Sequence, residues 1–184
     1  MNKILTTRGD AGRRLPAEWQ RGIDMARRYA TNGPRYTSYP TAPQFSEAFE
    51  LERYLNWQKR REHHADPLSL YVHIPFCHDI CYYCACNKVV TRREGVARRY
   101  LDHLSLELAM QSELVGRQRP VTQMHWGGGT PTYLDDGEIT ELMHGIASNF
   151  RLLDKGYREY SIEIDPRTVS AATVALLKGV GFNR

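Results

Sequence analysis

Four cysteines gathered in one short segment are the residues best suited to chemistry in this chain. They are Cys77, Cys81, Cys84 and Cys86, and the sequence has no others. Spacings of four, three and two residues keep the first three thiols within reach of one another on a short loop, so they can converge on one soft metal centre. This spacing suits a [4Fe-4S] cluster in which three irons take a protein thiolate and the fourth stays open to substrate.

A zinc site is the main alternative for the same cysteines. Structural zinc takes four ligands in a closed tetrahedron, and Cys86, His78 or His73 could supply the fourth. A set of disulfides is a third interpretation. The chain shows no export signal and no distant cysteine for a bridge to connect, so we set disulfides aside. Zinc stays open on spacing alone.

Three consecutive glycines mark a second place where a ligand could lie. They open the segment Gly127-Gly-Gly-Thr-Pro131. Glycines remove side chains where the backbone must come close to something, and a ligand against bare peptide groups explains three of them better than a plain turn does. A phosphate-binding loop is the rival, but the Lys-Ser/Thr ending of that motif is absent.

Glu163 is a third candidate because it interrupts an apolar segment. Isoleucines flank it, so it is expected to share a strand face with Ser161 and Asp165. It could simply face solvent. In a parallel sheet covered by helices, however, an inward carboxylate needs a partner, which makes Glu163 a candidate ligand-binding residue.

Strands alternating with helices are needed to position these three segments. The periodicity predicts strands at 68–74, 121–126 and 160–165 and helices at 92–116, 135–150 and 169–178, with a further strand expected to begin near Gly181. Such alternation favours an α/β fold with parallel strands and right-handed crossovers. Each candidate loop follows the carboxyl end of a strand, where β/α barrels place their chemistry.

The part of the chain before these units has a different character. Helices are predicted at 17–30 and 46–62, the second with Ser46 as its cap. Between them lies the proline-rich polar segment 34–43, which by itself could be a plain connection. We expect a domain boundary at residue 66, giving an N-terminal extension (1–66) and a second domain (67–184).

Bulk composition excludes several classes of function. The chain has 184 residues, 41% hydrophobic and 25% charged, with a net charge of +4, which is ordinary for a globular protein. Its apolar runs are far shorter than the roughly 20 residues that span a bilayer, so no membrane span is expected. The mild charge gives no support to nucleic-acid binding. Clustered reduced cysteines without an export signal favour the cytoplasm.

The string from Ser69 to Lys88, with CxxxCxxC at its centre, resembles the radical S-adenosylmethionine (SAM) superfamily. Within it, the sequence is similar to the oxygen-independent coproporphyrinogen III oxidases, in which a fourth cysteine follows the third by two residues. Residues 34–43 also resemble a family segment that lies over the mouth of the active site. The resemblance implies a partial radical SAM (β/α)6-type open barrel of about three βα units, preceded by a mostly helical extension.

The resemblance also implies roles for individual residues. It makes Cys77, Cys81 and Cys84 the ligands of a [4Fe-4S] cluster, leaves Cys86 outside the ligand set, and pairs Arg35 with a substrate propionate. It implies no catalytic side chain. We interpret Tyr82, His73 and His78 as residues that either support the ligands of the site or pack around it. The implied contacts with SAM are Tyr71, Tyr83, Gly128, Gly129, Thr130 and Glu163, the last on the ribose hydroxyls.

The reaction implied is one step of haem biosynthesis. Two propionate side chains of coproporphyrinogen III are oxidatively decarboxylated to vinyl groups, giving protoporphyrinogen IX, by way of a 5′-deoxyadenosyl radical from SAM. A monomer is expected, with an electron donor such as flavodoxin or ferredoxin. Six βα units at roughly 40 residues each exceed this chain, so we expect a fragment that is inactive alone. The alternatives are a haem chaperone, a haem-degrading radical SAM enzyme, or a non-catalytic zinc-binding module.

Overall fold

The computed structural model describes residues 16–30, 40–61, 66–93 and 95–184. The chain divides into two compact units, residues 1–48 and 49–184. The first contains the helix α1 (Ala17–Tyr29), which confirms the helix predicted there, and the 3-10 helix η1 (Ala42–Gln44). The domain boundary expected at residue 66 stays a prediction. Arg35 lies outside the described residues.

The second unit is built from parallel strands alternating with helices. In chain order it contains α2 (Leu51–Arg61), β1 (Leu68–Ile74), β2 (Phe76–Cys77), β3 (Val89–Val90), α3 (Val96–Val115), β4 (Pro120–Gly128), η2 (Pro131–Tyr133), α4 (Asp136–Asn149), β5 (Arg151–Leu152), β6 (Glu159–Ile162) and α5 (Ala171–Gly179). Strand β4 is central and pairs in parallel with β1, β5 and β6. The predicted α/β alternation with parallel pairing is thereby confirmed.

Three details differ from the sequence prediction. Helix α2 begins at Leu51, so Ser46 lies upstream of it and does not cap it. Strand β6 ends at Ile162, which places Glu163 just after the strand rather than in its middle. The strands β2, β3 and β5 were not predicted, because segments of two residues are too short to show a periodic pattern.

Strand register sorts the side chains onto two different faces. Tyr71 on β1 lies opposite His125 on β4, which in turn lies opposite Ser161 on β6. One residue further along, Val72, Trp126 and Ile162 form a row that points the other way. The predicted division of each strand into a polar and an apolar face is therefore confirmed.

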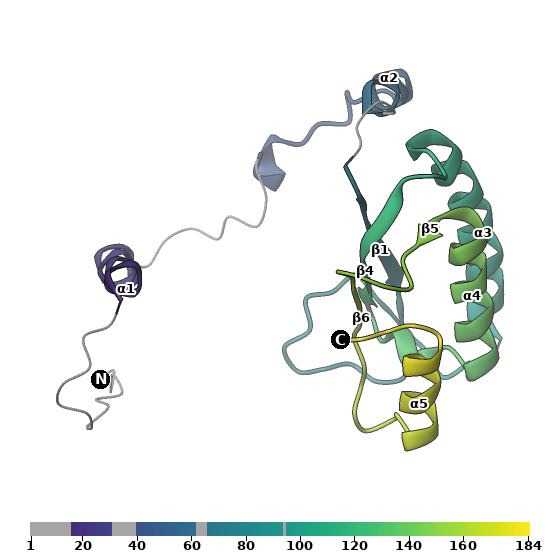
Figure 1. Ribbon diagram of the computed structural model, residues 1–184. Coiled ribbons are helices and arrows are strands. Elements are labelled where there is room, and N and C mark those ends of the chain that lie inside the picture. The colour runs from purple at the N-terminus through teal and green to yellow at the C-terminus, as the bar shows by residue number, and fades with distance from the viewer. Residues whose placement is uncertain (1–15, 31–39, 62–65, 94) are drawn as a thin grey trace. The chain divides into compact units, whose positions relative to one another are not determined.

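Helices cover the apolar face of the sheet. Figure 1 shows α3 and α4 packed side by side along it, with α5 near β6. Side chains that are almost fully buried here include Ile74, Val121, Met124, Trp126, Ile139, Ile146 and Tyr160. Burying one large apolar side chain contributes about 1.5–3 kcal/mol, so this face holds the strands in register. None of the helices in the described ranges is long and apolar enough to cross a bilayer.

Local signals define where the helices begin and end. Helix α4 starts with a capping box, in which the Asp135 side chain accepts from the Glu138 N–H and the Glu138 side chain accepts from the Asp135 N–H. The Ser170 side chain caps α5 by accepting from the Thr173 N–H. Helix α3 stops at Gly116, whose φ of 88° is left-handed. These local signals set the first residues of α4 and α5 and the end of α3, after which β4 begins.

The outer edge of β6 is engaged by the last residues of the chain. The N–H groups of Asn183 and Arg184 both donate to the Tyr160 carbonyl, and the Ile162 N–H donates to the Arg184 carbonyl. The Asn183 side chain adds bonds to the Tyr160 N–H and the Arg158 carbonyl. These residues form no strand, so the further strand expected near Gly181 stays a prediction.

Candidate active site

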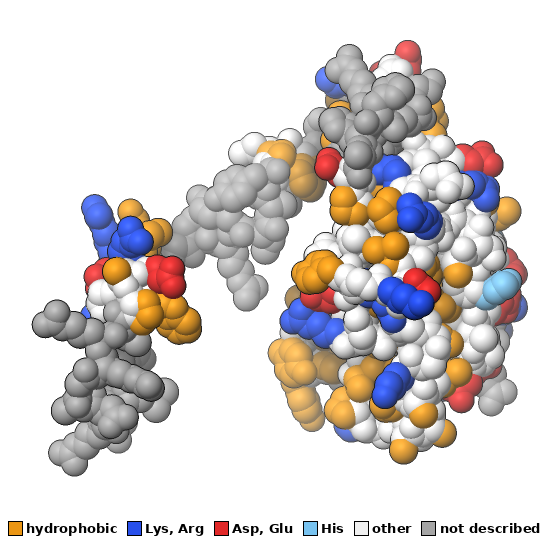
Figure 2. Space-filling view, in the orientation of Figure 1, with side chains coloured by type: hydrophobic (Ala, Val, Ile, Leu, Met, Phe, Trp, Pro, Cys, Tyr) orange, Lys and Arg blue, Asp and Glu red, His pale blue; other side chains and the backbone are white. Residues whose placement is uncertain are grey.

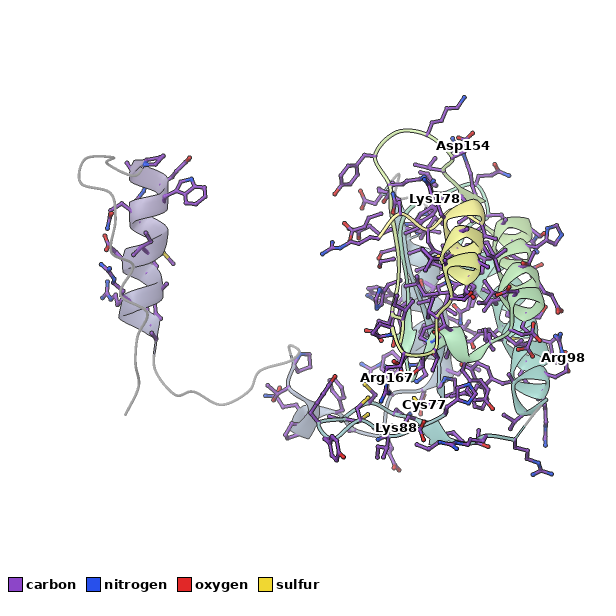
Figure 3. All side chains as sticks on the ribbon, turned by 90° about the horizontal axis from the view of Figure 1, so that it is seen from below. Cys77, Lys88, Arg98, Asp154, Arg167 and Lys178 are labelled. Atoms are coloured by element: carbon purple, nitrogen blue, oxygen red, sulfur yellow. The ribbon has the colours of Figure 1, made fainter. Side chains whose placement is uncertain are left out.

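The candidate residues gather at one end of the second unit. Figure 3 shows Cys77, Lys88 and Arg167 at the end where β1 and β4 finish, whereas Asp154 and Lys178 lie at the opposite end. The first end is the carboxyl edge of the parallel sheet, since Cys77 lies in β2 just after β1, and Gly128 is the last residue of β4. The structure thus confirms that the candidate loops share one edge.

A two-stranded pairing closes the base of the cysteine loop. Phe76 and Cys77 in β2 pair in parallel with Val89 and Val90 in β3. The Val89 N–H donates to the Pro75 carbonyl at 2.7 Å, and the Thr91 N–H donates to the Cys77 carbonyl at 2.9 Å. The pairing of β2 with β3 therefore holds the two ends of the loop 78–88 next to each other.

The four cysteines are free thiols in different surroundings. Cys77 is buried, Cys84 is half-buried, and Cys81 and Cys86 are exposed. Among the described residues, no three His, Cys, Asp or Glu side chains are grouped so as to hold a single metal ion. The convergence of the three predicted ligands on one centre therefore stays a prediction.

Electrostatics separates Cys84 from Cys86. Hydrogen bonding from the Cys86 backbone, helped by the Lys88 ammonium, lowers the pKa of the Cys84 thiol. Desolvation and the neighbouring Cys84 raise the pKa of the Cys86 thiol. A bound metal deprotonates its own thiol ligands, so these shifts do not select between the two thiols, and the ligand set of Cys77, Cys81 and Cys84 stays a prediction.

The glycines after β4 are required by contacts within the protein. A Cβ at Gly128, whose φ is 111°, would lie 2.5 Å from the ring of His73, and a Cβ at Gly129 would lie 2.6 Å from the Pro75 and Phe76 carbonyl oxygens. A Cβ at Gly127 would crowd His125 and Glu163. Close packing therefore explains the run without a ligand, and the contact of Gly128 and Gly129 with SAM stays a prediction.

His73 joins the strand end to the cysteine loop. Its Nε2 lies 3.0 Å from the Asn87 carbonyl oxygen, which can only accept, so this nitrogen carries a proton. Its Nδ1 lies 3.0 Å from the Tyr71 hydroxyl. Burial and the nearby Glu163 raise the pKa of Tyr71, which keeps that hydroxyl protonated. These two hydrogen bonds hold His73 between Tyr71 and the cysteine loop, and its expected role in support of the ligands stays a prediction.

Glu163 is held by two groups from β4. Its Oε2 accepts from the Gly128 N–H at 3.3 Å, and its Oε1 lies 3.5 Å from His125 Nε2. The other ring nitrogen of His125 is hydrogen-bonded to Ser161 Oγ at 2.7 Å, and the ring stacks on Tyr71 with centroids 5.8 Å apart. The expectation that this carboxylate needs partners is met, although about half of its side chain stays exposed.

The network through His125 and Ser161 was missed from the sequence. No role was predicted for His125. The signal that could have found it is register: three parallel strands with polar residues at matching positions place Tyr71, His125 and Ser161 in one row. This register places His125 between Tyr71, a predicted SAM contact, and Ser161.

Other residues near the site differ in how they are held. Asp165 turns away to form a two-pronged ion pair with Arg167, with N–O distances down to 2.6 Å, and these hydrogen bonds lower its pKa to about 2. His78 packs on Tyr133 with ring centroids 4.5 Å apart, as expected.

The aromatic residues of the cysteine loop are exposed. Tyr82 and Tyr83 are almost entirely open to solvent, as is most of Ile80. Figure 2 shows hydrophobic side chains projecting where this loop leaves the second unit. At this exposure the Tyr82 side chain does not pack within the described part of the chain, and its expected place around the ligands stays a prediction. Contact of Tyr83 with SAM stays a prediction.

Residues 71–184 match the Radical SAM superfamily. The chain belongs to this superfamily. Within it, the chain is 48% identical over 161 residues to the oxygen-independent coproporphyrinogen III oxidase of Pseudomonas aeruginosa, covering 88% of this chain and 35% of that protein. The protein of that name from Mannheimia haemolytica is 47% identical over 144 residues, 78% of this chain and 95% of its own length.

A solved structure of a radical SAM relative agrees with the fold. The coproporphyrinogen III oxidase of Escherichia coli, described as a radical SAM enzyme, matches with a TM-score of 0.74 at 47% identity, covering 81% of this chain and 33% of that one. These comparisons confirm the resemblance to the oxygen-independent coproporphyrinogen III oxidases. The chain spans about a third of the length of the curated relatives that it first matches.

The residues present fit the cofactors that the radical SAM superfamily implies. The thiols of Cys77, Cys81 and Cys84 are unpaired, and soft thiolates are the ligands that iron–sulfur clusters use. Glu163 offers a carboxylate that Gly128 and His125 contact, while about half of its side chain stays exposed. This donor set suits a cluster together with a ligand that carries hydroxyl groups, such as a ribose.

Proposed function

We propose that this chain forms the cluster-binding and SAM-binding part of an oxygen-independent coproporphyrinogen III oxidase. The overall reaction would convert two propionates of coproporphyrinogen III into vinyl groups, giving protoporphyrinogen IX and two CO2. Each conversion would consume one SAM, yielding methionine and 5′-deoxyadenosine, and would pass one electron to an external acceptor. When bound, the [4Fe-4S] cluster with SAM would supply a 5′-deoxyadenosyl radical that starts each decarboxylation. Cys77, Cys81 and Cys84 would hold that cluster, and Cys86 would stay outside the ligand set.

The observation that carries this proposal is the direct bonding between the cysteine segment and the glycine turn. The Gly129 N–H donates to the Ile74 carbonyl and the Thr130 N–H donates to the Phe76 carbonyl, each at 2.8 Å. The residue before the first cysteine is therefore tied to the residue after the three glycines. A cofactor spanning the two segments would meet both in one fixed arrangement, which is the pre-organisation that catalysis by positioning needs.

The protein's own groups would orient SAM rather than move protons. The open side of the Glu163 carboxylate would accept hydrogen bonds from the ribose hydroxyls, and His125 and the Gly128 N–H hold it in place to do so. Tyr71, stacked on His125, would form one wall of the site. Gly128, Gly129 and Thr130 would contact SAM along the turn, and Tyr83 would approach it from the cysteine loop.

Substrate recognition would involve the polar segment 34–43. Coproporphyrinogen III carries four propionates, and a guanidinium binds a carboxylate through two parallel hydrogen bonds. We infer that Arg35 makes such a pair. Replacing it by alanine should weaken porphyrinogen binding while SAM cleavage is kept, and unchanged porphyrinogen affinity would remove Arg35 from the site.

Anaerobic reconstitution tests the proposal. We expect the chain to take up iron and sulfide in the ratio of one [4Fe-4S] cluster and, once reduced with dithionite, to cleave SAM to methionine and 5′-deoxyadenosine. The C81A variant should lose the iron, whereas C86A should keep it. Tight binding of one zinc ion per chain without SAM cleavage would contradict the proposed enzyme and support a non-catalytic zinc-binding module. We infer that residues 1–184 alone do not turn over coproporphyrinogen III, and turnover would contradict that part.

A further inference from the structure

The hydroxyl of Thr130 makes a contact with a predicted cluster ligand. Thr130 Oγ1 donates a hydrogen bond to Cys77 Sγ over 3.5 Å, a normal length for a sulfur acceptor. Cys77 is 7% exposed and Thr130 is half-buried, so water competes weakly for this sulfur. Cys81 and Cys86, in contrast, are exposed.

Backbone contacts fix the Thr130 hydroxyl beside Cys77. The Thr130 N–H is bonded to the Phe76 carbonyl, so the two residues are tied through the neighbour of the cysteine. Gly129 approaches the backbone of Pro75 and Phe76 so closely that no side chain would fit between them. The hydroxyl therefore reaches the sulfur from a main chain that has little freedom to move.

The position of Thr130 makes this use of its side chain unexpected. It is the N-cap residue of η2, where a threonine hydroxyl usually accepts a hydrogen bond from a backbone N–H of the first turn. No such bond is formed here. The first turn is completed instead by main-chain bonds from Tyr133 to the Thr130 carbonyl and from Leu134 to the Pro131 carbonyl. The Thr130 hydroxyl is therefore available to donate its hydrogen bond to Cys77 Sγ.

We propose that Thr130 raises the reduction potential of the cluster through this hydrogen bond, a role that rests on the function proposed above. Reduction adds one electron from an external low-potential donor, and no bond of the protein forms or breaks. The added negative charge is shared with the ligand sulfurs, so a donor aimed at one of them binds the reduced state more strongly. Hydrogen bonds to the sulfurs are among the features that set cluster potentials.

An EPR-monitored redox titration of the reconstituted chain, without SAM, tests this role. T130V removes the donor at nearly constant volume, and T130S keeps it. We expect T130V to hold wild-type iron and sulfide, with a more negative midpoint. At a fixed solution potential its ratio of reduced to oxidised cluster should fall about threefold or more, the size of one modest hydrogen bond. T130S should titrate like the wild type.

Thr132 offers a matched control two residues away. Its hydroxyl is buried and has no hydrogen-bond partner among the described residues, so T132V should leave the midpoint unchanged. A wild-type midpoint in T130V, or an equal shift in T132V, would overturn the proposal. So would loss of iron from T130V alone, because the hydroxyl would then act in cluster assembly. Failure of the wild-type chain to build any [4Fe-4S] cluster would instead contradict the proposed function.

Discussion

The two faces of the central sheet show how one register serves two purposes. On one face Val72, Trp126 and Ile162 pack under helices. On the other face Tyr71 stacks on His125, which is hydrogen-bonded to Ser161. Side chains alternate between faces, so a slip of one residue would exchange the two sets. The apolar face supplies the free energy that fixes the register, and the polar face receives its geometry from that register.

Truncating the buried face should have the largest effect on stability. Trp126 is fully buried at the centre of the apolar face, so W126A should lower the free energy of unfolding by about 3–5 kcal/mol. Q123A, on the exposed side of the same strand, should stay within about 0.5 kcal/mol of the wild type. Urea denaturation followed by circular dichroism measures both. Equal losses of unfolding free energy in W126A and Q123A would contradict the claim that the apolar face supplies most of the stability.

The glycine turn should be the next most sensitive place. A methyl group at Gly129 would collide with two carbonyl oxygens that cannot move without disturbing β2, so G129A should cost about 1–3 kcal/mol. Gly179 in α5 has open space around it, and G179A should cause no loss. The same denaturation experiment checks both variants. A neutral G129A would show that the close approach to Pro75 and Phe76 is not needed.

On the polar face the expected effect is on ligand binding rather than on folding. H125F removes the partner of Glu163 while it keeps a ring to stack on Tyr71. SAM should then bind the reconstituted chain about tenfold more weakly, because the Glu163 carboxylate keeps only the Gly128 N–H as a partner. His144 is exposed on α4, and H144F serves as the control. Equilibrium dialysis measures the SAM affinity. An unchanged affinity in H125F would show that His125 does not position Glu163 for SAM binding.

The smallest effect concerns the ion pair after β6. Hydrogen bonds from Arg167 lower the pKa of Asp165 from the usual 3.8 to about 2. The carboxylate therefore favours folding above pH 3.8, and this contribution disappears as the pH falls toward 2. In R167Q the pKa of Asp165 should return toward its usual value, which a carbon-13 NMR titration of the carboxyl group can follow. R92Q, which breaks a different exposed pair, should leave it unchanged.

Periodic features of this fold could be predicted from the sequence, and contacts between distant segments could not. Strand β1 was predicted at its observed bounds, because alternation from Leu68 to Ile74 is set by local side-chain pattern. The start of α2 was misplaced by several residues, since Ser46 has the right chemistry for a cap without the backbone to use it.

For the candidate site, the sequence supplied the residue types but not their partners. The cysteines, the glycine run and Glu163 stood out by type and spacing. The contacts His73–Asn87, His125–Glu163 and Thr130–Cys77 join residues far apart in the chain or on different loops. Their distances depend on how strands and loops come together in three dimensions. The need for glycine was likewise attributed to a ligand, whereas the surrounding backbone and side chains already require it.

The short pairing of β2 with β3 has a consequence for how strongly the cysteine loop can hold a metal. Joining the ends of a loop of this length costs roughly 2 kcal/mol of chain entropy, and here the ladder between Phe76–Cys77 and Val89–Val90 has met that cost before any ion arrives. The thiols therefore lie on a loop whose ends are already joined before a metal binds. Binding at one sulfur raises the effective concentration of the others, so the loop should load its metal cooperatively rather than one ligand at a time.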